Sequence, residues 1–308
     1  MAAHTAPPAG SSSGPAAGRF TGTGSAPDTG SGPASGPAPG PVSKADGGLG
    51  RLVADTCSSV LRVLLAYRHS PGLIAASLAV PVVMVVVFGY VFGSAMQVPG
   101  GGNYREFLMP GLFAMVAVNG IMPTMVGTAR DIGRGVSDRL RSMPVSRTGL
   151  LLGQSLADLL VSVCVLALLV GVGLAAGWRI RGGVADAAGA FALLLLFRFT
   201  MTWVGTCLGL IVGKEETAGQ LAVMVFPLAM VTNAYTPTGG MPGWLRAAAD
   251  WNPVSAVVQA CRELFDNPAA AGPAWPMQHA LPAALLWCAV LTAVFGPLAV
   301  RKFATHGR

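Results

Sequence analysis

The stretch GAFALLLLFRFTMTWVGTCLGLIVG, residues 189–213, decides the fold class of this chain. It is long enough to cross a bilayer as a helix, since a span needs about 20 mostly apolar residues to cover roughly 30 Å of hydrocarbon. Arg198 is its only Lys, Arg, Asp or Glu residue. The long apolar flanks still favour insertion, so the stretch predicts a transmembrane helix with an arginine near its middle.

Five further apolar stretches of this kind predict five more spans. They cover residues 71–93, 107–129, 149–176, 217–235 and 278–300, and the fifth span along the chain, 217–235, ends at a turn rich in Pro and Gly. The composition agrees, with 53% hydrophobic and only 11% charged residues and a mean hydropathy of +0.60. The sequence therefore predicts an all-α polytopic membrane protein with six transmembrane helices.

The charge and the cysteines exclude several other classes of protein. A net charge of +7 could suggest nucleic acid, but the basic residues are scattered around the spans and form no soluble basic face, so we expect no nucleic-acid partner. The cysteines are far apart and include no CxxC pair, which indicates neither a zinc site nor a disulfide scaffold. They are Cys57, Cys164, Cys207, Cys261 and Cys288.

The basic residues also predict the orientation in the membrane. With six spans, most lysines and arginines fall on the side that carries both termini. The opposite side carries only Arg105, Arg179, Arg181, Arg246 and Arg262. By the positive-inside rule, both termini are expected in the cytoplasm, with the chain crossing the cell's inner (plasma) membrane several times.

Two segments are expected to precede the first span. Residues 1–48 are nearly all Ala, Gly, Pro, Ser and Thr, a composition typical of a disordered cytoplasmic tail, and no apolar signal-peptide region lies near Met1. Residues 49–70 have leucines and valines at helical spacing, which predicts an amphipathic helix in the inner headgroup region. This helix could contact a cytoplasmic partner, anchor the chain at the interface, or do both. Residues 71–308 are then expected to form the six-span transmembrane domain.

The loop between the second and third spans, residues 130–148, is the most charged in the chain. Ser137 can cap a short helix that Pro144 then bounds. Such a helix could transmit movement from a cytoplasmic partner into the membrane, although on charge alone an ordinary basic loop that sets topology is favoured. The candidate coupling residues are Arg134, Ser137, Asp138, Arg139, Leu140 and Arg141.

Between the fifth and sixth spans, residues 237–276 are predicted to form a re-entrant element on the outer face. Asn252 followed by Pro253 is a good helix start, with an N-cap and a proline at the first helical position. Trp244 and Trp251 suit the membrane–water boundary. The element could act as an outer gate or as a packed extracellular cap.

Three motifs give the chain a family resemblance. They are GRGVSDRLRSMPVSRTGLLLGQSLADLL in and after the basic loop, GWRIRGG at 177–183, and MPGWLRAAADWNPVSAVVQACRELF at 241–265. From Tyr67 to the C-terminus the chain resembles type-2 ATP-binding-cassette exporter permeases, in particular their daunorubicin-resistance branch. Only the N-terminal tail falls outside this likeness.

The resemblance implies a permease that pairs with a second copy, or with a related chain, and with two separate nucleotide-binding subunits that use ATP and Mg. It makes residues 136–143 the coupling helix and 49–68 the connecting helix, both seated on the ATPase. The pathway would run along the dimer interface, and membrane lipid would be a further partner. The branch implies export of an antibiotic or other amphiphile; the alternatives are a lipid or glycan precursor, or a non-transport membrane interaction protein.

The residues themselves do not predict an enzyme. Gly209, Gly213 and Lys214 come nearest to a phosphate-binding loop, but the glycines are too close together and Glu215 stands where Ser or Thr is required. With Gly205, the two glycines instead form a small-residue ladder that suits close helix packing. No HExxH motif or pair of carboxylates occurs within a span, so we expect no catalytic residues, bound metal or cofactor on this chain.

Arg198 requires a partner, because an arginine near the bilayer centre costs about 2.5 to 3.5 kcal/mol even on a lenient scale. Arg198 and Asp158 lie equally far from the ends of adjacent predicted spans, roughly 13 Å deep at about 1.5 Å per residue. We therefore predict a buried ion pair between them that holds the two helices together, and favour this role over contact with substrate. Asn119 and Asn233 are the alternative polar partners.

Overall fold

The computed structural model describes residues 71–93, 103–133, 147–269 and 272–305. All of them belong to one compact unit, Asp46–Arg308. Three predictions lie outside the described residues: the tail 1–48, the amphipathic helix 49–70, and the coupling residues from Arg134 to Arg141.

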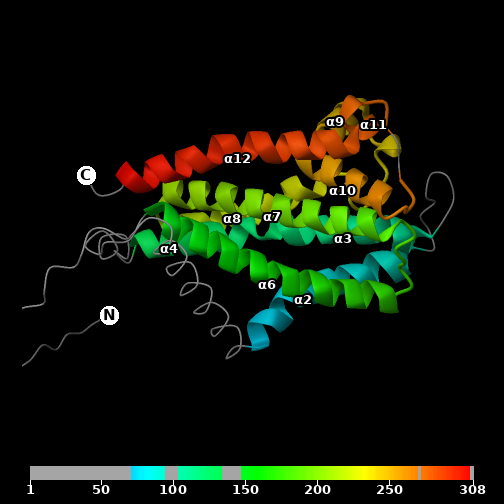
Figure 1. Cartoon of the computed structure of the whole chain (residues 1–308), viewed down its shortest axis with the longest axis horizontal. Coiled ribbons are helices and arrows are strands. Elements are labelled where there is room, and N and C mark those ends of the chain that lie inside the picture. Colours follow the sequence, from blue (N-terminus) through cyan, green and yellow to red (C-terminus); the bar gives the residue numbers. More distant parts are fainter. Residues whose placement is uncertain (1–70, 94–102, 134–146, 270–271, 306–308) are drawn as a thin grey trace, which may run out of the picture. The chain divides into compact units, whose positions relative to one another are not determined.

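The described residues form helices and no strand, and the successive long helices run in alternating directions, except that α4 continues the direction of α3 (Figure 1). The long elements are α2 (Pro71–Val86), which continues into the π-helical turn η1 (Val87–Phe92), α3 (Tyr104–Asn119), α4 (Ile121–Gly133), α6 (Arg147–Ala175), α7 (Val184–Val212), α8 (Glu215–Met230) and α12 (Ala280–Thr305). The short elements are η2 (Thr238–Gly240), α9 (Gly243–Asp250), α10 (Pro253–Leu264) and α11 (Trp275–Gln278). We call these short elements, residues 238–278, the cap.

The predicted fold class, an all-α polytopic membrane protein, is confirmed. Within the described residues, four helices are long and apolar enough to cross a membrane: Tyr104–Gly133, Asp158–Ala175, Val184–Val212 and Ala280–Phe303. They coincide with the second, third, fourth and sixth predicted spans. The first and fifth spans are also helical, but α8 has 16 residues and a length of only about 24 Å, so the count of six spans stays a prediction.

The second span is broken at Gly120, between α3 and α4. The local cause is Pro123, which has no N–H for the carbonyl of Asn119 and whose ring crowds that carbonyl. Gly120 keeps a right-handed helical conformation, with φ −66° and ψ −19°, so the chain continues in nearly the same direction. The break therefore frees backbone groups in the middle of a span.

The fifth predicted span was placed too far along the chain. Residues 217–235 were expected to be helical, but α8 ends at Met230 and residues 231–236 are not helical. The helix stops because side chains of α3 and of the cap bind the backbone beyond it, as described below. These partners lie far away in the sequence, so local patterns could not reveal them.

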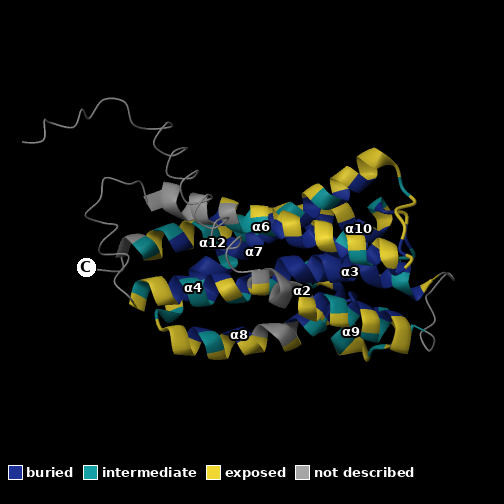
Figure 2. Ribbon diagram, turned by 90° about the horizontal axis from the view of Figure 1, so that it is seen from below, coloured by how far each residue is buried: buried dark blue, intermediate teal, exposed yellow. Residues whose placement is uncertain are grey.

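At the centre of the described unit, α7 packs against α3, α4, α6, α10 and α12. Figure 2 shows α3 buried, whereas α8 and α12 carry broad exposed surfaces. Many of the exposed side chains on α2, α6, α8 and α12 are large and apolar, including Val83, Leu168, Val223 and Leu286. Apolar side chains facing outward are expected where lipid is the solvent.

Candidate functional site

Three helices contribute to a polar cluster in the middle of the bundle. Arg198 on α7 points its Nη2 at Asp158 Oδ2 on α6, 3.5 Å away. The Arg198 side chain is 9% exposed and that of Asp158 29%. Thr124 Oγ1 on α4 lies 2.9 Å from both Asp158 Oδ2 and Gly120 O, so its single proton can be given to only one of them at a time. The predicted contact between Arg198 and Asp158 is therefore present, and α4 takes part in it as well.

Arg198 also binds the broken second span. Gly120 N–H donates to Ala117 O, three residues back, and Arg198 Nη1 donates to the carbonyl of Val116, the residue four back, at 3.4 Å. Space for the guanidinium exists only because residue 120 is glycine: a Cβ there would lie 1.3 Å from Nη1. The arginine thus fills the place of a side chain at the break.

The two alternative polar partners have other surroundings. Asn119 lines the cavity described below. Asn233 lies beyond α8, where its N–H donates to Ser255 Oγ at 3.1 Å and its Nδ2 donates to Ser255 O at 3.3 Å.

The glycine ladder packs α7 against α4 of the same chain. A Cβ at Gly205 would lie 2.8 Å from Ile121 O, and one at Gly209 would lie 2.5 Å from Met125 O. Gly213 serves another purpose, because it ends α7 with φ 67°, a left-handed conformation that favours glycine.

Residues 231–235, which we call the linker segment, join α8 to the cap without helical structure. Their carbonyls accept hydrogen bonds from side chains of α3 and the cap. Asn252 Nδ2 donates to Val231 O (3.0 Å), Arg262 Nη2 to Asn233 O (2.9 Å) and Ala234 O (3.2 Å), and Tyr104 Oη to Tyr235 O (2.6 Å). Non-helical backbone at membrane depth requires such partners. Side chains therefore set the path of this segment.

The predicted outer residues lie in the cap. Asn252 caps α10 as predicted, accepting a hydrogen bond from Val254 N at 2.9 Å, and Pro253 is the first residue of that helix. Trp244 is 76% exposed and Trp251 56% exposed. Exposed indole rings suit a membrane–water boundary, whereas the gating role of the cap stays a prediction.

Two of the motifs that carry the resemblance meet in space. Trp178 from GWRIRGG is fully buried and packs edge-on against Phe113 and Phe265, with ring centroids 5.1 and 5.3 Å away. Gly182 N donates to Phe265 O at 3.1 Å, and a Cβ on Gly182 would lie 2.5 Å from Leu264 O. The α6–α7 loop thus anchors the end of α10.

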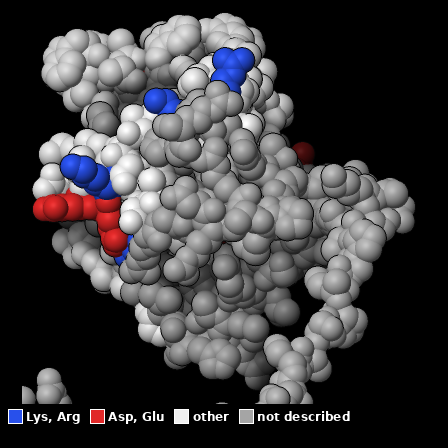
Figure 3. All heavy atoms as spheres, turned by 90° about the vertical axis from the view of Figure 1, so that its left-hand side faces the viewer, with Lys and Arg blue, Asp and Glu red and all other residues white. Residues whose placement is uncertain are grey.

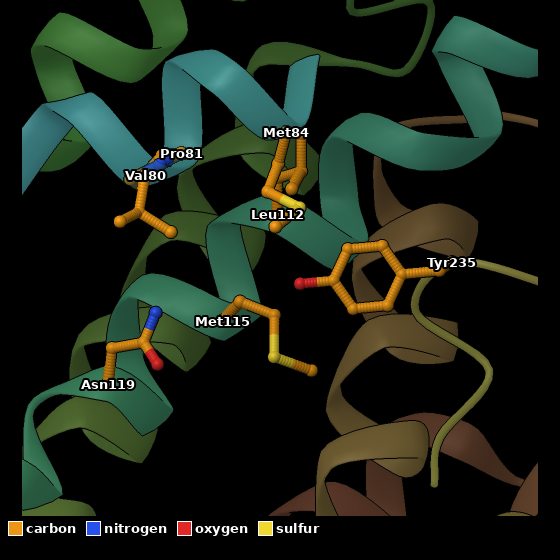
Figure 4. Close-up of a pocket in the computed structure, with 7 residues that line it drawn as sticks. All are labelled: Val80, Pro81, Met84, Leu112, Met115, Asn119 and Tyr235. Carbon is orange, nitrogen blue, oxygen red and sulfur yellow. The ribbon is translucent and has the colours of Figure 1, made fainter. Parts of the chain in front are cut away.

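A cavity opens between α2, α3 and the linker segment (Figure 4). The pocket is shallow, and the space that it encloses is about enough for one water molecule. The lining residues are Val80, Pro81, Met84, Leu112, Met115, Asn119 and Tyr235. The Tyr235 hydroxyl and the Asn119 amide both point into it, from opposite ends, between apolar walls (Figure 4). Such a lining suits an apolar ligand that carries a few polar groups.

The end of the bundle opposite the cap carries charged residues (Figure 3). Arg130 at the end of α4 and Glu215 at the start of α8 form an ion pair with 2.5 Å between Nη2 and Oε1. Both side chains are 45% exposed, so the pair is expected to stabilise little. Within the described residues, no cluster of His, Cys, Asp or Glu could hold a metal ion.

Sequence reasoning missed three residues of these sites: Gly120, Tyr235 and Arg262. For Arg262 a signal existed, because it follows Val254 and Val258 at four-residue spacing and so shares their face of α10. That face is buried, and Arg262 is 0% exposed. Tyr235 had no local signal, since its position depends on α3.

Comparison with known proteins gives consistent matches. A family model described as ABC-2 type transporter matches residues 55–265. The chain is 32% identical to the daunorubicin resistance ABC transporter permease protein DrrB1 of Streptomyces coeruleorubidus, over 82% of this chain and 86% of that protein. It is 21% identical to the probable doxorubicin resistance permease DrrC of Mycobacterium tuberculosis, over 82% and 91%. A putative transport permease of Pyropia yezoensis, ycf38, is 24% identical over 70% and 75%.

Proposed function

Since this chain belongs to the ABC-2 type transporter family, we propose that it is the permease subunit of an exporter that moves an antibiotic or another amphiphilic small molecule out of the cell. Both termini would lie in the cytoplasm and the cap on the outer side of the plasma membrane. The energy would come from ATP and Mg on a separate nucleotide-binding subunit.

The family match carries the substrate class, and the lining of the pocket between α2, α3 and Tyr235 agrees with it. Its walls are aliphatic and thioether side chains, and only two polar groups, Asn119 and Tyr235, point into it. Such a lining favours apolar molecules with a few polar groups over highly charged ones. Two relatives are named for daunorubicin and doxorubicin resistance, which supports the same class.

A second copy of this chain is the proposed partner within the membrane, with a related permease as the alternative. The exposed faces of α2, η1 and α8 carry large apolar side chains, among them Val83, Tyr90 and Met224. Pairing over such faces would place the cavity between the two copies, next to lipid.

Transport in inverted vesicles tests the function. Vesicles that contain the chain and its ATP-binding subunit should accumulate daunorubicin when ATP is added. Vesicles whose ATP-binding subunit lacks its catalytic glutamate provide the control. The variant pair Asn119→Leu and Tyr235→Phe should raise the apparent KM for the drug. Active ATP hydrolysis without movement of daunorubicin would instead favour a lipid or glycan precursor as cargo.

A measurement of ATP hydrolysis tests whether a separate subunit supplies the energy. The purified chain alone should hydrolyse no ATP, and adding the ATP-binding subunit should give hydrolysis that daunorubicin alters. Turnover by this polypeptide alone would contradict the proposal.

Coupling is proposed to pass through the loop 130–148. Replacing Arg139 and Arg141 by Glu should abolish export while leaving membrane insertion normal, because the partner ATPase would lose its basic contact. The matched control replaces Arg19 and Lys44 of the tail by Glu, which changes the net charge equally. If the loop variant exports the drug at the wild-type rate, the loop serves only to set the membrane topology of the chain.

A further inference from the structure

Arg262 is the most deeply buried charged group in the described part of the chain. It lies on α10, is 0% exposed, and its guanidinium carbon is 3.6 Å from the centre of the Phe107 ring. Among the described residues no carboxylate lies within ion-pair distance of it, and Nη1 has no hydrogen-bond partner. A buried cation without a counter-ion is costly, so plain stability does not account for it.

The hydrogen bonds of Arg262 join three separate parts of the chain. From α10, Nε donates to Phe107 O on α3 at 3.0 Å, and Nη2 donates to Asn233 O and Ala234 O of the linker segment. The planar guanidinium offers five donors in a fixed fork, which a lysine ammonium cannot reproduce. One side chain thus binds α10, α3 and the linker segment together.

Two further features hold the linker segment close to α3. Gly111 lets the chain approach, because a Cβ there would lie 2.3 Å from Ala234 O. Tyr104 Oη donates to Tyr235 O at 2.6 Å, one residue beyond the carbonyls that Arg262 binds. The position of Tyr235, whose ring forms one wall of the cavity, follows from these contacts.

We propose that Arg262 is a positioning residue of the export path: it fixes the linker segment on α3 and thereby sets where Tyr235 stands in the cavity wall. Movement of α10 away from α3 and the linker segment breaks the bonds to Phe107 O, Asn233 O and Ala234 O, so the cap and the cavity are coupled through this side chain. The role in export rests on the proposed function, whereas the control of the linker segment does not.

Hydrogen exchange measured by mass spectrometry on the full chain in nanodiscs tests the control of the segment. In Arg262→Lys, exchange of the peptide covering residues 231–237 should be faster by about tenfold or more, as expected for losing hydrogen bonds from a charged donor. Tyr104→Phe removes only the hydroxyl bond and should give a smaller rise in the same peptide. Arg179→Lys, at an exposed arginine of the α6–α7 loop, should change nothing.

A transport measurement separates positioning from general stability. The ratio of the apparent KM values for daunorubicin and for ethidium should change in Arg262→Lys and in Tyr104→Phe, because the cavity wall moves. A merely structural role would lower the amount of folded protein and leave that ratio as in the control.

The outcomes decide as follows. Faster exchange confined to residues 231–237, with an altered KM ratio, supports the proposal. Unchanged exchange, a rise that extends equally to peptides of α7, or an unaltered KM ratio overturns it. If Arg262→Lys does not reach the membrane, hydrogen exchange and the KM ratio are measured on Tyr104→Phe, and the same outcomes then support or overturn the proposal. If the wild-type chain transports neither compound, the proposed function fails, while the exchange data still test the hold on the segment.

Discussion

Replacing Gly120 by alanine is the sharpest test of the polar cluster in the middle of the bundle. The new Cβ would lie 1.3 Å from Arg198 Nη1 and 2.0 Å from Cζ, so the guanidinium has to leave its place. Gly127, in α4 of the same span, provides a matched control, because a Cβ there would meet nothing within 4 Å.

The expected free-energy change follows from what Arg198 loses. Its bonds to Val116 O (3.4 Å) and Asp158 Oδ2 (3.5 Å) are long, so their joint loss is expected near the lower end of the range for charged hydrogen bonds, about 2 kcal/mol. Replacing glycine by alanine within a helix stabilises the folded state by about 0.5 to 1 kcal/mol. Gly120→Ala should therefore destabilise by about 1 to 1.5 kcal/mol, whereas Gly127→Ala should stabilise by about 0.5 to 1 kcal/mol.

The assay is reversible unfolding of the purified chain in mixed micelles by increasing fractions of SDS. The same substitution is also made in an Arg198→Met background. There the guanidinium no longer occupies the space, so Gly120→Ala should become neutral or stabilising. An equal cost of Gly120→Ala in both backgrounds, or equal stability of the Gly120 and Gly127 variants, would refute the reasoning.

Three further predictions concern named pairs and packing sites. Asp158→Arg or Arg198→Asp alone should reduce the amount of folded protein in the membrane, and the double swap should restore part of it, as immunoblots of membrane fractions would show; two losses without recovery would contradict the pairing. Gly209→Ala should destabilise the chain by about 1 to 3 kcal/mol in SDS titration, because its Cβ would meet the backbone of α4, which cannot rotate away. Arg130→Ala should cost at most about 1 kcal/mol, and 0.5 M salt should remove the difference, since its ion pair with Glu215 is half exposed; a larger, salt-independent loss would contradict this.

Part of the candidate site could be predicted because it depends on depth along a span. Arg198 and Asp158 lie at matching positions of adjacent helices, and a rise of about 1.5 Å per residue was enough to bring them to the same level. The cap of α10 by Asn252 was predictable for a similar reason, since the side chain binds a backbone N–H only two residues away. The break at Gly120, in contrast, needed both the local effect of Pro123 and a guanidinium from another helix.

The sequence by itself determined the fold class, the spans that α3, α4, α6, α7 and α12 occupy, and the membrane environment, because hydrophobic length and helix start signals act between residues close together in the chain. Only the tertiary structure decided that α8 ends at Met230, that Tyr235 enters the cavity wall, and which carbonyls Arg262 binds. The bond from Arg262 to Phe107 O joins residues 155 positions apart. Partners this distant leave no periodic pattern, because the energy that satisfies the linker segment arises only when α3 and α10 are packed together.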